Sequence, residues 1–458
     1  MSELNYNASG CVPNWFDRLF FVFVIIFSGG ALAFVRSQGA MILLGTGAAL
    51  SLVLHGMFPR RSFFTALLVW MGYFVLSTLS IGSFHPYFML EIPILMLAGY
   101  ALINVWGNKI FEHYSRCIYI LSAISLVFYA WHLVLPGTLR NFVDAFDCQG
   151  DLFPQAWRNC GSVIIYSINE TVGTGGIPRN CGFCWEPGPF SCFIVLALFF
   201  NYCLNTPEKR SRKINLILIA ALLTTFSTTG YMMFGCLAIY YIWQHQNNLV
   251  RIGSIFAVLV AVVLFFQLDF LGQKVQDQLE MTNDWSILVE NSRLYGKHYT
   301  PGRFISLKLA WMNFEERPIF GYAGNTLLEY SYLQGASVAV ISGIGLIMAR
   351  YGACGLLMFS VILLTSGRRM QQDSRQKSCF IFILWLVFNV MIGISFKLMF
   401  TPIFFGFFFC GLFQQQKNAA DDEPAPQLPP AAGSDPGLPE KLPEATALVS
   451  IQRGAETI

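Results

Sequence analysis

Long apolar runs separated by short polar connections dominate the chain from residue 17 to residue 413. Most runs are close to the roughly 17–25 residues that an α-helix needs to cross a bilayer. The pattern predicts an all-α polytopic membrane protein with about twelve transmembrane helices. The predicted helices are 17–36, 39–57, 63–82, 86–106, 115–135, 187–205, 213–229, 230–243, 251–271, 352–366, 378–396 and 398–413.

Lys and Arg in the connections predict the orientation, because cytoplasmic loops carry an excess of both. Counted from the N-terminus, the even-numbered connections are rich in them, whereas the short odd-numbered ones hold only Arg36 and Lys397. We therefore expect both termini in the cytoplasm and the two long odd-numbered connections, about 136–186 and 272–351, outside it. Connections of this length favour a function of their own.

Composition supports this class of protein. The chain is 55% hydrophobic and 12% charged, whereas a soluble domain carries about 25% charged residues. The net charge of +3 is too small to indicate nucleic-acid binding. Residues 421–443 are rich in Pro, Ala, Asp and Glu, so we expect a membrane domain over 1–413 and a disordered cytoplasmic tail over 414–458.

The segment Arg179–Phe190 ends the first polar loop and opens a long apolar run. Arg179 and Glu186 lie seven residues apart in it, and Gly182, Pro187 and Gly188 predict an irregular backbone between loop and helix. One interpretation is the rim of an active site that faces out of the cell. The alternative is a turn before the helix in which Arg179 and Glu186 simply form an ion pair.

Arginines gather at the predicted outer ends of helices. A guanidinium group keeps its charge and presents a fork of donors, which suits a phosphate or pyrophosphate. A set contributed by two loops favours a site for a lipid pyrophosphate, although each arginine alone could instead reach lipid headgroups or pair with a nearby Glu. The candidate binding residues are Arg179, Arg303, Arg317, Arg350 and Arg158.

Acid–base candidates are fewer. Proton removal from a sugar hydroxyl needs a carboxylate or a neutral imidazole, and Glu186, Glu290 and His298 are the candidates in the outer loops. Within the membrane, Glu91 is the notable ionisable residue, because a buried charge there is costly. It could couple a transporter to protons or pair with an arginine.

Several local predictions concern the outer loops. Cysteines 148, 160, 181 and 184 allow three disulfide pairings, of which Cys148–Cys160 is preferred, with a zinc site at Cys181-x-x-Cys184 as the alternative. Residues 302–316 predict an amphipathic helix with one apolar side, formed by Phe304, Leu307, Trp311 and Phe314. The apolar segment 336–348 is expected to lie along the outer surface.

Four short segments follow one another between residues 179 and 356. They are Arg179–Phe190, Thr224-Thr-Phe-Ser-Thr-Thr-Gly230, Arg303 through Glu316-Arg-Pro-Ile-Phe-Gly321, and Arg350-Tyr-Gly-Ala-Cys-Gly355. In this order they resemble motifs of the bacterial O-antigen polymerase and O-antigen ligase superfamily, integral-membrane glycosyltransferases of the GT-C type. The chain departs from the first motif by one extra residue between Phe183 and Glu186.

The resemblance implies an active site facing the periplasm, in a protein of the bacterial inner membrane. It implies a substrate linked to undecaprenyl pyrophosphate, and no metal, cofactor or nucleotide sugar. By position in the motifs, Arg179 and Arg303 would bind the pyrophosphate. We expect Glu186 to be the third catalytic residue, as a base or as a residue that orients an arginine, and Arg317, Arg350, His298 and Arg158 to bind substrate. A chain-length regulator protein is the partner that such systems imply.

The resemblance favours a polymerase that joins lipid-linked oligosaccharide repeat units into O-antigen or capsule. Ligases of this superfamily carry a catalytic His before the last motif, and residues 325–346 contain no His. A ligase that transfers glycan to lipid A core or protein is the first alternative. A flippase for the lipid-linked oligosaccharide is the second, since about twelve helices fit it equally well.

Overall fold

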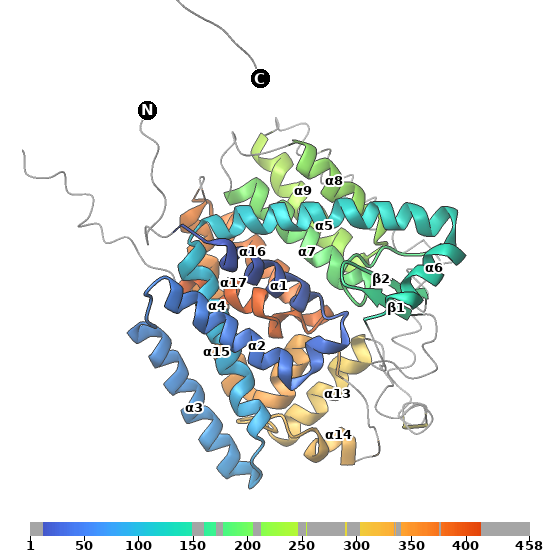
Figure 1. Ribbon diagram of the computed structural model, residues 1–458. Coiled ribbons are helices and arrows are strands. Elements are labelled where there is room, and N and C mark those ends of the chain that lie inside the picture. Colours follow the sequence, from blue (N-terminus) through green and yellow to red (C-terminus); the bar gives the residue numbers. More distant parts are fainter. Residues whose placement is uncertain are drawn as a thin grey trace, which may run out of the picture. The chain divides into compact units, whose positions relative to one another are not determined.

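The computed structural model describes residues 12–148, 160–170, 177–204, 212–245, 253, 289–290, 303–333, 335, 340–374 and 377–413. These residues form packed helices with one small hairpin (Figure 1). Apart from residue 253, the predicted helix 251–271 lies outside the described residues, as does the predicted disordered tail 414–458.

The helices agree with most of the predicted runs. In chain order they are α1 (Trp15–Gly29), α2 (Gln38–Leu54), α3 (Arg61–Ile81), α4 (Pro86–Trp106), α5 (Lys109–Val134), α6 (Pro136–Ala145), α7 (Pro187–Phe199), α8 (Arg212–Thr224), α9 (Thr228–His245), α13 (Arg303–Glu316), α14 (Tyr330–Leu333), α15 (Gly343–Asp373), α16 (Cys379–Ser395) and α17 (Pro402–Phe413). Short 3-10 turns are η1 (Ala33–Arg36), η8 (Thr326–Leu328) and η9 (Leu398–Phe400), and α7 continues as a π-helical segment, η5 (Phe200–Leu204). Strands β1 (Cys160–Val163) and β2 (Tyr166–Asn169) pair antiparallel, with Cys160 opposite Asn169.

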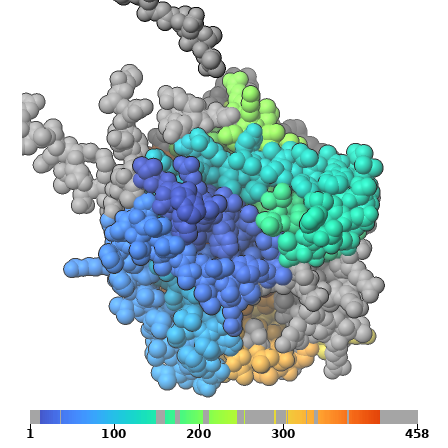
Figure 2. Space-filling view, in the orientation of Figure 1, coloured from blue at the N-terminus to red at the C-terminus, as the bar shows by residue number. Residues whose placement is uncertain are grey.

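Five helices within the described ranges are long and apolar enough to cross a membrane. They are α3, α4, α5, α15 and the continuous helix Pro187–Leu204. This supports an all-α membrane protein, while the predicted number of about twelve crossings is not confirmed: α2, α16 and α17 are apolar but shorter. Figure 2 shows the first four helices, in blue, over a large part of one face. Exposed apolar residues such as Leu68 and Leu79 on α3 suit contact with lipid tails.

Helix α7 occupies the interior. Every one of its residues from Pro187 to Phe199 is buried, and it packs against α5, α8 and α9 (Figure 1). Pro187 stands at the first helical position, where its fixed φ suits the helix and its missing N–H costs nothing. The segment Arg179–Phe190 therefore leads from the preceding polar segment into the centre of the bundle.

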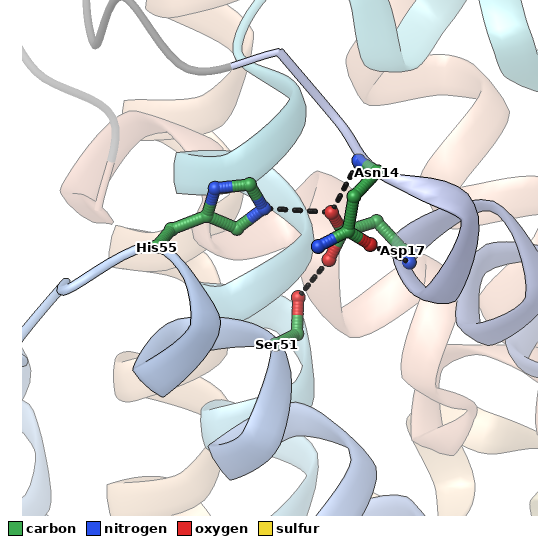
Figure 3. A network of polar contacts seen from close by, with 4 residues as sticks. All are labelled: Asn14, Asp17, Ser51 and His55. Atoms are coloured by element: carbon green, nitrogen blue, oxygen red, sulfur yellow. Dashed lines mark hydrogen bonds and ion pairs between the residues drawn. The ribbon is translucent and has the colours of Figure 1, made fainter.

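A buried carboxylate joins the start of α1 to the end of α2 (Figure 3). Asp17 is 1% exposed and accepts hydrogen bonds from Ser51 Oγ at 2.6 Å and from the Asn14 backbone N–H at 2.8 Å. His55 Nε2 lies 2.7 Å from Asp17 Oδ2. Asn14 Oδ1 in turn accepts a hydrogen bond from the Asp17 backbone N–H, and the two bonds together form a capping box.

We expect Asp17→Asn to destabilise the protein, because an amide NH2 would face donors that now point at a carboxylate. The free energy of unfolding should fall by about 1–3 kcal/mol. Asp144→Asn is the matched control: Asp144 is exposed on α6 and pairs along its own helix with Arg140 at 3.0 Å, a pair worth under about 1 kcal/mol. Thermal unfolding in detergent measures both; equal midpoints would contradict the assignment.

Three local predictions need correction. Helix α13 forms as predicted, but Trp311 is 51% exposed, whereas Ser306 and Asn313 are buried because they hydrogen-bond to backbone and side chains of 329–342. Residues 343–348 belong to α15 and are largely buried against α13, so this part does not lie along the surface. The cysteines in the described part of the chain form no disulfide, and the preferred Cys148–Cys160 bridge is therefore wrong.

Candidate functional site

The first and second motif segments bind each other. Arg179 donates from Nε to the Thr225 carbonyl at 3.0 Å and from Nη2 to the Phe226 carbonyl at 2.7 Å. Asn180 is fully buried, its N–H donates to the Thr224 carbonyl, and its side-chain amide donates to Thr224 Oγ1 at 2.9 Å. The turn between α8 and α9 thus holds Arg179 in place. The backbone strain of this turn is at Phe226, which has a φ of +46°.

The same turn contacts the first residues of α7. Ser191 Oγ donates to the Gly188 carbonyl at 2.6 Å and lies 2.9 Å from Ser227 Oγ. A Cβ on Gly230 would lie 2.4 Å from Ser191, so only glycine permits this approach. The Ser/Thr-rich segment before Gly230 therefore fixes the geometry at the start of α7.

Arg303, the first residue of α13, reaches the same place from the other side. Its Nη1 donates to Thr229 Oγ1 at 3.2 Å, and its guanidinium carbon lies 4.4 Å from the centre of the Phe396 ring. Thr229 Oγ1 is 3.0 Å from Ser395 Oγ. A Cβ on Gly188 would sit 2.3 Å from the Phe396 ring and 3.2 Å from Arg303 Nη2. Because Gly188 has no side chain, the start of α7 leaves space for the Arg303 guanidinium group to pack on the Phe396 ring.

Arg179, Arg303 and Glu186 form one electrostatic group. Burial lowers the pKa of both guanidinium groups, and Glu186 opposes that effect on each of them. The two arginines also act on one another, since Arg303 further lowers the pKa of Arg179. Both remain cations near neutral pH. Two partly buried cations sharing one carboxylate attract an anion, because desolvated like charges are costly without a counter-ion.

The third and fourth motif segments also bind each other, through their backbones. Gly352 interrupts α15 with a φ of +61°. The N–H groups of Ala353 and Cys354, beyond this kink, donate to the Pro318 and Ile319 carbonyls at 2.7 and 3.2 Å. The carbonyls of Ala349 and Arg350, before it, accept from Tyr322 and Ala323 at 3.0 and 2.8 Å. The kink thereby satisfies the groups that a broken helix leaves unpaired.

A second charged cluster surrounds Arg350. Its guanidinium carbon lies 4.6 Å from the centre of the Phe88 ring on α4. Arg350 and Lys397 both interact electrostatically with Glu91 and with Glu329. Glu329 is 6% exposed, and Asn313 Nδ2 donates to its Oε2 at 3.0 Å. We call these four residues, Glu91, Glu329, Arg350 and Lys397, the second cluster.

Glu329 gives the second cluster a pH dependence. Burial is the main cause that raises its pKa from 4.5 to about 7. A carboxyl group with a raised pKa in the folded state adds stability that is complete below pH 4.5 and is lost as the pH rises through 7. We expect the free energy of unfolding of the wild type to fall by about 3 kcal/mol over this window. Glu329→Gln should remove the fall while keeping the bond from Asn313.

Thermal unfolding in detergent between pH 5 and 8 measures this difference. Glu316→Gln is the control, since Glu316 is exposed at the end of α13. A wild-type profile parallel to that of Glu329→Gln would contradict the prediction.

The structure places the other predicted site residues as follows. Arg350 belongs to the second cluster and not to the group around Arg303. Arg317, at the far end of α13, lies over the Tyr322 ring at 5.4 Å, about 21 Å along the helix from Arg303. Glu290 is exposed. Arg158 and His298 lie outside the described residues.

The described residues supply no further ligands for the alternative zinc site at Cys181-x-x-Cys184. Cys181 and Cys184 are buried and joined by a tight turn, with the Cys184 N–H donating to the Cys181 carbonyl at 3.0 Å. Within the described ranges, no three His, Cys, Asp or Glu side chains gather as a metal would need. Burial raises the pKa of both thiols above the usual range, which disfavours the thiolate that zinc binds.

Sequence reasoning missed several residues of both clusters. Thr229 lies within the motif segment that ends at Gly230. Phe396, Glu329 and Asn313 were not indicated as site residues by any sequence pattern. Lys397 stood out only as a lone cation between two apolar runs. Glu91 was singled out, and the structure gives it Arg350 as an electrostatic partner.

A scan against protein-family models and a search of curated proteins both find no match for the chain.

Proposed function

We propose that the chain is a metal-independent polysaccharide polymerase of the bacterial inner membrane. Its substrates would be oligosaccharide repeat units on undecaprenyl pyrophosphate, and its product a surface polysaccharide such as O-antigen or capsule. Both termini would be cytoplasmic and the two outer loops periplasmic. One observation carries the proposal: Arg179 and Arg303, far apart in the sequence, both donate hydrogen bonds to the segment 225–229, which contacts the start of the central helix.

In the proposed reaction, a hydroxyl of the new repeat unit attacks the anomeric carbon of the growing chain. A bond forms between that oxygen and the anomeric carbon, and the bond from this carbon to the pyrophosphate oxygen breaks. The electron pair leaves with the pyrophosphate, whose growing charge Arg179 and Arg303 stabilise. Glu186 interacts electrostatically with both arginines and would accept the hydroxyl proton.

Gene disruption in the cells that produce the protein tests the proposal against both alternatives. Loss of a polymerase leaves single repeat units attached to the final acceptor. Loss of a ligase leaves none attached, with long glycan still on its lipid carrier, and loss of a flippase leaves the lipid-linked repeat on the cytoplasmic side. Gel analysis of the surface glycan and of extracted lipid carriers separates the three, and either of the last two results would overturn the proposal.

A further inference from the structure

An apolar slot runs along one side of the described bundle. It is a cavity of about 570 Å³ between α3, α4, α15 and α17. Its lining is almost entirely apolar and aromatic, and it includes Trp70, Met96, Met358, Phe405, Phe408 and Phe409. From Ser62 to Tyr73 it follows about 16 Å of α3. The volume lies within the range of pockets that bind small ligands, and the long shape suits an extended chain.

The slot opens sideways towards the lipid. Val69 on α3 and Leu357 and Val361 on α15 line it, yet they are 52%, 68% and 49% exposed. In a membrane these edges face hydrocarbon, so a chain can enter from the bilayer without crossing water. Methionine and aromatic side chains in the walls adapt to an irregular apolar ligand.

Residues of the second cluster adjoin the lining of the slot. Ile92 and Tyr351 line it and directly follow Glu91 and Arg350 in the chain, and Met399 lies two residues after Lys397. Two groups in this cluster are unsatisfied within the described part of the chain: Glu91 Oε2 and Arg350 Nε are buried without a hydrogen-bond partner. A long apolar slot beside a cluster that holds two cations, Arg350 and Lys397, together with the carboxylates Glu91 and Glu329, suits a hydrocarbon chain that carries a phosphate headgroup.

We propose that the slot binds the isoprenoid tail of the second lipid-linked substrate, with its diphosphate against Arg350 and Lys397. The inference rests on the proposed function, because a polymerase joins two lipid-linked substrates and so needs two diphosphate sites. Arg179 and Arg303 would hold the diphosphate that leaves, and the second cluster the one that is retained by the incoming repeat unit. A glycerophospholipid is the competing occupant, which the competition experiment below distinguishes.

The two sites meet at one short segment. Arg303 packs on Phe396, and the next residue, Lys397, belongs to the second cluster. The anomeric carbon at the first diphosphate and a hydroxyl of the sugar at the second could therefore approach across the junction between α16 and η9. Glu329, whose pKa burial raises to about 7, can take a proton when a second phosphate arrives, which lowers the repulsion.

Photolabelling tests the inference. The probe is an isoprenoid diphosphate with a diazirine near the middle of its tail, added to purified full-length protein in phosphatidylcholine nanodiscs, with labelled peptides mapped by mass spectrometry. We expect labelling of α3, α15 and α17 in the wild type. Val69→Trp narrows the slot and should lower this labelling at least about fivefold. Leu68→Trp, the adjacent residue that does not line the slot, should leave it unchanged.

Competition identifies the ligand. Excess unlabelled isoprenoid diphosphate should abolish labelling, whereas phosphatidylglycerol should not. Equal labelling in Val69→Trp and Leu68→Trp, or equal competition by phosphatidylglycerol, would overturn the proposal, the latter because an ordinary bilayer lipid then occupies the slot.

Charge variants separate this inference from the proposed function. Lys397→Gln should lower labelling of the slot, whereas Arg303→Ala should keep it within about twofold of wild type, because Arg303 serves the other diphosphate. If Arg303→Ala abolished labelling, the slot would belong to the lipid at Arg179 and Arg303, and the assignment to the second substrate would fail. Failure of the proposed function shows in the gene-disruption products, which do not depend on the slot.

Discussion

Replacing Arg303 by Ala or by Lys is expected to stop the synthesis of long glycan. Removing one preorganised donor from a developing negative charge typically costs about 100-fold to 1,000-fold in rate. Lysine should not rescue, because it lacks the planar fork that donates to Thr229 while packing on Phe396. The measurement is the chain-length distribution of surface glycan in a disrupted strain carrying each variant, normalised to the amount of membrane-inserted protein.

Arg317→Ala is the matched control for Arg303. It removes the same charge from the same segment, but Arg317 follows the other end of α13 and packs on Tyr322. We expect its glycan to remain close to wild type. Long glycan in both Arg303 variants would exclude this residue from the reaction. A loss in Arg317→Ala as large as in Arg303→Ala would show that any change in α13 is sufficient.

Replacing Gly352 by Ala is expected to cost the most in stability. The residue has a φ of +61°, and a Cβ would lie 2.5 Å from the Ile319 oxygen and 2.7 Å from the Gly321 nitrogen. Both neighbours are backbone atoms held by hydrogen bonds, so neither can move aside cheaply. Strain and overlap together should lower the free energy of unfolding by about 3–5 kcal/mol.

The control for this change is Gly72→Ala. No heavy atom lies within 4 Å of a Cβ built on Gly72, which is inside α3. Alanine should be neutral or stabilise the helix by up to about 1 kcal/mol. The yield of monodisperse protein after detergent extraction and the midpoint of thermal unfolding report both. A Gly352→Ala midpoint within 1–2 °C of wild type, a shift on the order of experimental scatter, would contradict the steric argument.

Elements with strong local signals were predictable. The apolar run 86–106 coincides with α4, because Pro86 begins the helix and Gly107 follows its end. Helix α13 was predicted, but its buried face was not. Hydropathy assigns Trp311 to the interior, whereas the structure buries Asn313, whose cost is offset by hydrogen bonds to Glu329 and Ser331. A polar residue is buried when it finds partners, and those partners lie outside the helix.

The candidate site was predictable in part for a similar reason. Arg179 and Arg303 stand out as cations near helix starts, so the sequence indicated them as a pair. The separation of Arg350 into a second cluster depends on α4 lying beside α15, with Phe88 under the guanidinium group. That contact joins residues more than two hundred positions apart, and no local pattern encodes it. Lys397 gains its importance from the same packing.

The docking of residues 318–323 onto 349–354 has a consequence for how such proteins can be recognised. The four hydrogen bonds described above join main-chain atoms. They therefore depend little on which side chains are present, except that positions 321 and 352 require glycine. Distant relatives that share this arrangement would therefore keep little sequence identity, and their relationship would be recognised from the backbone fold instead of the sequence.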